Sequence, residues 1–121
     1  MVVVGNSIQK RFVVIEIKTV QALDGVWNDD ALVLFKHSTQ CGRSAQVYEE
    51  VRNFKAEHPE VRIHLVKVIE ARPVSNEVER RTGVRHESPQ VLILKSGAVV
   101  WHEAHLRVTA GALAEHLGYG R

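Results

Sequence analysis

The strongest constraint on the fold is the alternation of short apolar runs with amphipathic helix patterns along the chain. The run 31–36 is apolar up to its final lysine, which is typical of a strand buried on both faces of a sheet. Farther on, Val47, Tyr48, Val51 and Phe54 recur at helical spacing and form one apolar stripe. Strands joined through helices form parallel pairs with right-handed crossovers, so the pattern predicts an α/β protein.

The predicted elements follow one another as β-α-β-α-β-α-β-β-α. A hairpin signal, Ser96-Gly97, separates the last two strands, and Thr109 is the predicted cap of the final helix. The order indicates a mixed sheet of four or five strands with helices on both faces, in a single domain over 12–121 that follows an N-terminal tail, 1–11. Strands are predicted at 12–18, 31–36, 61–69, 91–95 and 98–102, and helices at 20–27, from the single cysteine to His58, at 73–82 and at 109–117.

Charge, the length of apolar stretches and the cysteine count exclude several classes of protein. The chain has 16 basic and 14 acidic residues, a net charge of +2, so nothing favours a nucleic-acid partner. No apolar stretch approaches the roughly 20 residues of a membrane span, and the N-terminus does not have the order of a secretory signal. One cysteine excludes an intrachain disulfide and favours a reducing compartment. We therefore expect a cytoplasmic protein with no membrane partner.

The single cysteine, Cys41, follows a predicted strand and precedes a predicted helix. Helix N-termini and nearby cations lower the pKa of a thiol, and the thiolate is its reactive form. Ser44 occupies the position of the second cysteine in a CxxC redox motif, which predicts a one-thiol site. A mixed disulfide on Cys41 would then be cleared by an outside thiol. The alternative is a buried and inert cysteine.

Polar neighbours of Cys41 are candidates for supporting roles. Lys36, His37 and Arg43 would form a cationic neighbourhood that lowers the thiol pKa, and His37 could also contact a bound small thiol; ordinary surface charge is the alternative for Lys36 and Arg43. Ser44 would either donate to the sulfur or supply polarity at the helix start. One cysteine and one histidine do not make a zinc site, so no metal is expected.

Four sequence segments resemble, in the same order, those of a known family: 35–41 with Ser44, 72–76, 83–90 and 101–105. Ser88-Pro89 precedes the predicted hairpin, as the cis-proline does in the thioredoxin fold. The segments are similar to those of the YtxJ family, the monothiol bacilliredoxins of the bacillithiol redox system. The resemblance covers about residues 17–117. That family commonly has Pro-Ile after the cysteine, where this chain has Gly42-Arg43.

The resemblance implies a thioredoxin-like fold and a thiol–disulfide oxidoreductase that removes bacillithiol from protein mixed disulfides. Cys41 would be the nucleophile assisted by Ser44, and Ser88 and Pro89 would offer backbone to the substrate. The small thiol would be contacted by His37, Arg43 and Arg85. The border of the substrate-binding surface would include His86 and Glu87. No cofactor is implied beyond bacillithiol as co-substrate. The implied partners are bacillithiolated client proteins, with bacillithiol or a partner redoxin as reductant.

Two other functions stay open. Cys41-Gly42-Arg43-Ser44 resembles the Cys-Gly-Phe-Ser stretch of monothiol glutaredoxins, which implies an iron–sulfur cluster carrier. Those proteins have a glycine pair after the proline strand, whereas this chain has only Gly97 there. The other alternative is a thioredoxin-like adaptor whose thiol is incidental.

Overall fold

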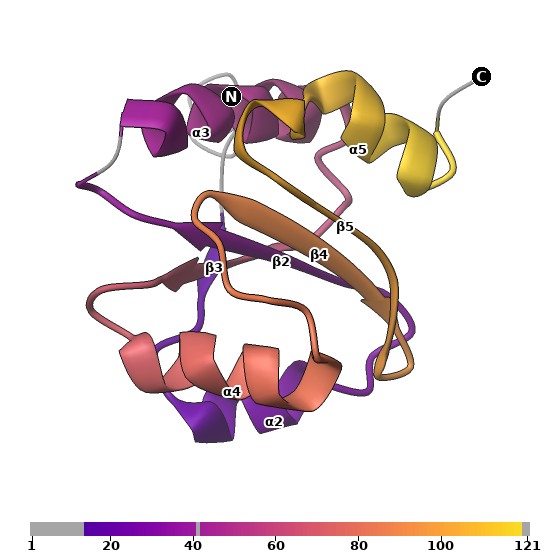
Figure 1. Ribbon diagram of the computed structural model, residues 1–121. Helices are drawn as coiled ribbons and strands as arrows, with labels where there is room; N and C mark the ends of the chain where they lie inside the picture. Colours follow the sequence, from indigo (N-terminus) through magenta and orange to yellow (C-terminus); the bar gives the residue numbers. More distant parts are fainter. Residues whose placement is uncertain (1–13, 41, 120–121) are drawn as a thin grey trace, which may run out of the picture.

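The computed structural model describes residues 14–40 and 42–119, and the predicted tail, 1–11, lies outside them. Four helices flank a five-stranded sheet in this part of the chain (Figure 1). In chain order the elements are β1 (Ile15–Glu16), α2 (Val20–Val26), β2 (Leu32–His37), α3 (Gly42–Glu57), β3 (Ile63–Lys67), α4 (Arg72–Thr82), β4 (Gln90–Lys95), β5 (Ala98–Ala104), the short 3-10 helix η1 (His105–Arg107) and α5 (Ala110–His116).

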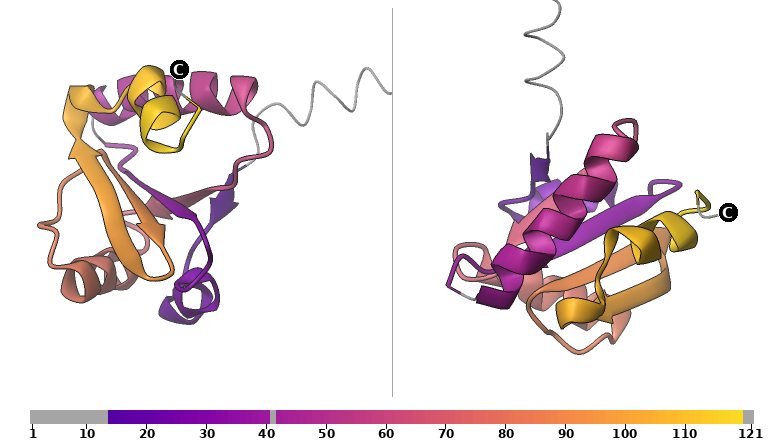
Figure 2. Two further views of the ribbon diagram at one scale, coloured as in Figure 1. Left: turned by 90° about the vertical axis from the view of Figure 1, so that its right-hand side faces the viewer. Right: turned by 90° about the horizontal axis from the view of Figure 1, so that it is seen from above.

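The sheet is mixed, as the sequence predicts, with the order β1-β3-β2-β4-β5. β3 pairs in parallel with β1 and β2, whereas β4 runs antiparallel to both β2 and β5. Helices α3 and α5 cover one face, and α2 and α4 cover the other (Figures 1 and 2). β2 is the central strand of the sheet, and the chain passes from its C-terminal end to α3.

Alternation along β2 divides the core into two clusters. Val33 and Phe35 pack in the cluster with α3 and α5, while Leu32 and Leu34 pack in the cluster with α2 and α4. Successive side chains of a strand point to opposite faces. The last two residues of β2, which are polar, are divided between the two faces in the same way.

Helix boundaries agree with the local signals in the sequence. The Thr19 hydroxyl accepts a hydrogen bond from the Ala22 amide, and Thr109 caps α5 in the same manner. Gly83 ends α4 in the left-handed conformation, at φ 73°. Among the described residues, β1 and β3 are shorter than the predicted strands and β5 extends two residues farther, to Ala104. No local pattern in the sequence predicts η1. β1 is an edge strand whose register joins only two of its residues to β3.

Gly97 in the β4–β5 hairpin has a conformation that favours glycine. Its φ is +85°, and a Cβ there would lie 2.8 Å from Asn28 Oδ1. We expect Gly97→Ala to lower the free energy of unfolding by about 1 kcal/mol, measured by urea denaturation. Gly25→Ala, within α2 and with open space around its Cβ, is the matched control and should raise stability by about 0.5 kcal/mol. Equal stability of the Gly97 variant and the parent would contradict this account.

Candidate functional site

The candidate site lies where β2 ends and α3 begins, at one edge of the sheet. Cys41 falls between these elements in the sequence and lies outside the described residues. The predictions that concern its sulfur therefore stay predictions. The residues on both sides of it, 38–40 and the first turn of α3, are described and show how the site is framed.

Ser44 shapes the segment that precedes Cys41. Its side chain is fully buried, and its hydroxyl oxygen accepts a hydrogen bond from the Ser38 amide at 3.2 Å. The Ser38 hydroxyl in turn accepts from the Gln40 amide at 3.2 Å. Ser44 is thus more than polarity at a helix start, because it holds the backbone of 38–40 against the first turn of α3.

His37 is buried against aromatic rings on the α3 face. Its ring centroid lies 5.0 Å from that of Tyr48 and 5.5 Å from that of Phe35. Burial, and secondarily the charge of Lys67, lowers the pKa of His37 below its ordinary value of 6.5. The ring is therefore neutral at pH 7, and its Nδ1 is buried with no hydrogen-bond partner among the described residues.

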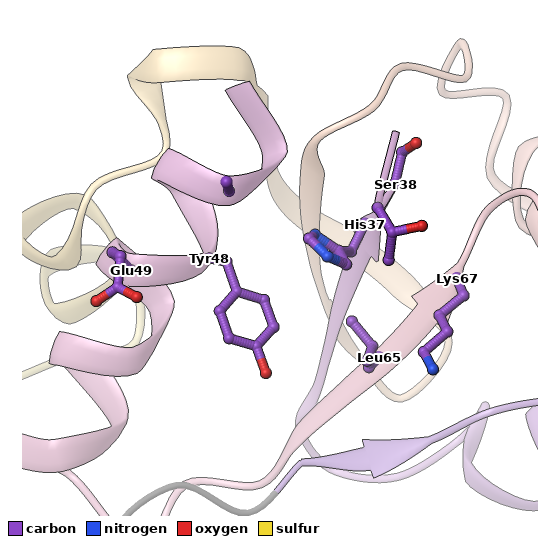
Figure 3. A pocket seen from close by; sticks show the side chains of 8 residues that line it. His37, Ser38, Tyr48, Glu49, Leu65 and Lys67 are labelled. Atoms are coloured by element: carbon purple, nitrogen blue, oxygen red, sulfur yellow. The ribbon is translucent and has the colours of Figure 1, made fainter. Parts of the chain in front are cut away.

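A pocket of about 470 Å³ opens beside His37. Its lining includes His37, Ser38 and Thr39 from the end of β2 and beyond, Tyr48 from α3 and Lys67 from β3. Figure 3 shows the His37 and Tyr48 side chains next to one another, with Leu65 and Lys67 of β3 nearby. The pocket gives a small molecule access to the face of α3 next to the segment that precedes Cys41.

The structure separates the three members of the predicted cationic neighbourhood. Lys36 is completely buried, and it points toward α4, on the face of the sheet opposite to His37. His37 is neutral at pH 7 because of its burial. Arg43 alone is an exposed cation, on the first turn of α3. Lys36 and His37 lie on opposite faces of the sheet because successive side chains of a strand alternate between its two faces.

Residues 84–89, the proline loop, connect α4 to β4 and reach the same edge of the sheet. The Ser88–Pro89 peptide bond is cis, as the resemblance implies, and Pro89 is buried. The register pairs Lys36 of β2 with Gln90 of β4, so the end of β2 and the end of the proline loop lie side by side. The structure thus brings His37, Ser88 and Pro89 to one edge, with Arg85 exposed farther along the loop.

Hydrogen bonds hold the proline loop along its length. The Gln90 side chain donates to the Arg85 carbonyl at 3.1 Å and accepts from the Glu87 amide at 3.3 Å. The Glu87 carboxylate lies 2.6 Å from His105 Nε2, and the His105 amide donates to the Pro89 carbonyl at 2.9 Å. No local sequence pattern predicts this role for His105, because the pair forms only when η1 lies beside the loop.

The described residues 14–40 and 42–119 contain no group of three histidine, cysteine, aspartate or glutamate side chains placed to hold a metal ion. Within the same ranges, no helix has the length and apolar character needed to cross a membrane.

Residues 15–113 match the protein family described as Monothiol bacilliredoxin BrxC. Among solved structures, a protein described as a candidate oxidoreductase with a thioredoxin fold is 26% identical, with a TM-score of 0.81 over 87% of this chain and 94% of that one. Thioredoxin from Trypanosoma brucei brucei is 17% identical, with a TM-score of 0.73 over 88% of each chain. Fasciola hepatica thioredoxin is 17% identical, with a TM-score of 0.69 over 88% of this chain and 99% of that one. The thioredoxin-like fold predicted from the sequence is confirmed.

Proposed function

Because this chain belongs to the monothiol bacilliredoxin family, we propose that it removes bacillithiol from protein mixed disulfides through Cys41. The observation that carries the proposal is the family match over residues 15–113 of a chain with a single cysteine. A lone thiol cannot form an intrachain disulfide, so each turnover must pass through a mixed disulfide with another molecule. A thiol–disulfide oxidoreductase is the class of enzyme that uses such a step.

The reaction has two exchange steps. The Cys41 thiolate attacks the bacillithiol sulfur of the client's mixed disulfide, so a disulfide forms between Cys41 and bacillithiol while the client sulfur leaves as a thiolate and takes up a proton. A second bacillithiol, or a thiol of a partner redoxin, then attacks the adduct. The attacking thiol forms a disulfide with the bound bacillithiol, the bond between bacillithiol and Cys41 breaks, and Cys41 is restored as a thiol. The chemistry requires a reducing compartment such as the cytoplasm.

Residues around the site supply supporting roles. Ser44 fixes residues 38–40 through the Ser38 amide and, by its position three residues after Cys41, is our candidate donor to the sulfur. Ser88 and Pro89 are the proposed docking backbone for the client. His37, Arg43 and Arg85 are the proposed contacts of the small thiol, with His37 acting as a neutral hydrogen-bonding ring rather than a cation.

The glycine that follows Cys41 is compatible with this role. Gly42 is the first residue of α3, and a Cβ there would meet no atom within 4 Å. Proline is favoured at the first position of a helix. The Pro-Ile of the family would therefore fit the local backbone, and Gly42 by itself gives no reason to prefer an iron–sulfur carrier.

The test is an intact-mass time course of the reduced protein incubated with a bacillithiolated client, beside the Cys41→Ser variant. We expect the parent protein to gain one bacillithiol as the client loses it, and the variant to leave the client modified. A client that stays modified with the parent protein would refute the proposed activity. An absorbance spectrum after anaerobic purification would then test the cluster carrier.

A further inference from the structure

A lysine is buried at the end of the central strand, on a face of the sheet where the preceding side chains are apolar. Lys36 has no exposed surface, and Leu32 and Leu34, which precede it on the same face of β2, belong to the apolar cluster beneath α2 and α4. Lysine is almost never fully buried unless its amine is paired. The Lys36 amine must therefore be accounted for by specific partners.

Two partners come from different elements. Lys36 Nζ donates to the Ser75 carbonyl of α4 at 3.3 Å, and it lies 3.3 Å from Nδ1 of His86 in the proline loop. The Ser75 hydroxyl lies 3.1 Å from the same nitrogen. A lysine ammonium can only donate, so His86 Nδ1 must accept and the imidazole proton resides on Nε2. Strand, helix and loop thus meet at one histidine.

This cluster completes the restraint of the proline loop. His105 holds the loop from the side of η1, through the Glu87 carboxylate and the Pro89 carbonyl. Lys36 and Ser75 hold His86 from the opposite side, beneath the sheet. His86 is two residues from Ser88, so a shift of its ring would move the backbone proposed to dock the client.

We propose that Lys36 is a positioning residue, whose amine fixes the proline loop through His86 and so governs client docking at Ser88 and Pro89. The inference rests on the proposed function for its catalytic consequence, whereas the tether itself does not. Because Lys36 points away from the α3 face, its loss should leave the intrinsic reactivity of the Cys41 thiol unchanged. Docking and thiol chemistry are therefore separable by mutation.

The chain offers a matched control in a second buried lysine. Lys55 of α3 is 6% exposed, and its amine also donates to backbone carbonyls, those of Pro59 at 2.7 Å and Val61. Those carbonyls follow the end of α3, whereas the proline loop reaches the edge of the sheet where α3 begins. Lys55→Met thus removes a buried amine without touching the loop.

The experiment compares Lys36→Met with Lys55→Met and the parent protein. We expect Lys36→Met to speed amide hydrogen exchange of residues 84–89 at least tenfold and to slow client de-bacillithiolation about tenfold. Alkylation of Cys41 by iodoacetamide should stay within twofold. Lys55→Met should match the parent in all three. His86→Leu should behave like Lys36→Met, whereas His86→Asn, which keeps an acceptor near Nδ1, should recover most of the client rate.

Three outcomes would overturn the inference. They are unchanged exchange in the proline loop of Lys36→Met, an unchanged client rate, or an equal loss in Lys55→Met. If the parent protein itself leaves the client modified, the proposed function fails. The exchange comparison then still decides whether Lys36 holds the loop, because that measurement requires no substrate.

Discussion

Lys36→Met is expected to be more stable than the parent protein at pH 7, by about 2 kcal/mol, although it removes two polar contacts. Burial lowers the pKa of Lys36 from 10.5 to about 8, against a smaller opposing effect of Glu79. Each unit of pKa difference between folded and unfolded states corresponds to about 1.4 kcal/mol. Methionine fills the same space without a charge, and His86 Nδ1 keeps the Ser75 hydroxyl as a donor.

The stability difference should depend on pH with a defined sign. In the unfolded chain the lysine keeps its ordinary pKa, so between pH 8 and 10.5 the unfolded state binds more protons than the folded state. The parent protein is therefore stabilised as the pH rises through this window, and the penalty is fully present below it. His86, the other titratable partner, has a pKa lowered by burial and then by Lys36, so it is neutral throughout the window.

Urea denaturation at pH 7 and pH 10 measures this difference. The advantage of Lys36→Met should be largest at pH 7 and should shrink toward zero at pH 10. Lys95→Met, which removes an exposed lysine from the end of β4, should stay within about 0.5 kcal/mol of the parent at both values. A Lys36→Met protein that is less stable than the parent at pH 7 would show that the amine is a net structural contributor.

Local signals made the order of elements predictable. Thr19 and Thr109 mark helix starts, Gly83 marks a helix end and Ser96-Gly97 marks the hairpin, and each of these features acts within a few residues of the chain. The cis bond before Pro89 could be anticipated only through the family resemblance. Strand lengths were harder to predict, because they depend on the register with a partner strand.

The arrangement of the site depends partly on local alternation and partly on contacts between distant parts of the chain. Lys36 and His37 are adjacent in sequence, and strand alternation alone was enough to place them on opposite faces. The burial of Lys36 was not predictable in the same way, since it depends on α4 and on His86, 50 residues away. The His105–Glu87 pair likewise joins residues 18 apart that no local pattern connects.

Ser44→Cys is expected to change the product left on the protein. The residue would restore a two-thiol CxxC spacing with Cys41, and cysteine is close to serine in size at this fully buried position. After Cys41 takes bacillithiol from a client, the introduced thiol would attack the Cys41 sulfur. An intrachain disulfide would then form and bacillithiol would leave as a thiol. Release of bacillithiol would no longer need an outside thiol, whereas the new intrachain disulfide would need an outside reductant before the next turnover.

Intact mass under non-reducing conditions separates the two products. Ser44→Cys should finish lighter by two hydrogen atoms, whereas the parent protein should finish with one bacillithiol added. Ser44→Ala is the matched control, because it also removes the acceptor of the Ser38 amide but supplies no thiol; it should keep the adduct. Both variants should lose about 1 kcal/mol of stability from that weakened or missing hydrogen bond. A persistent adduct on Ser44→Cys would mean that position 44 does not present its side chain to the Cys41 sulfur, and the proposed role of Ser44 as a donor to that sulfur would fall with it.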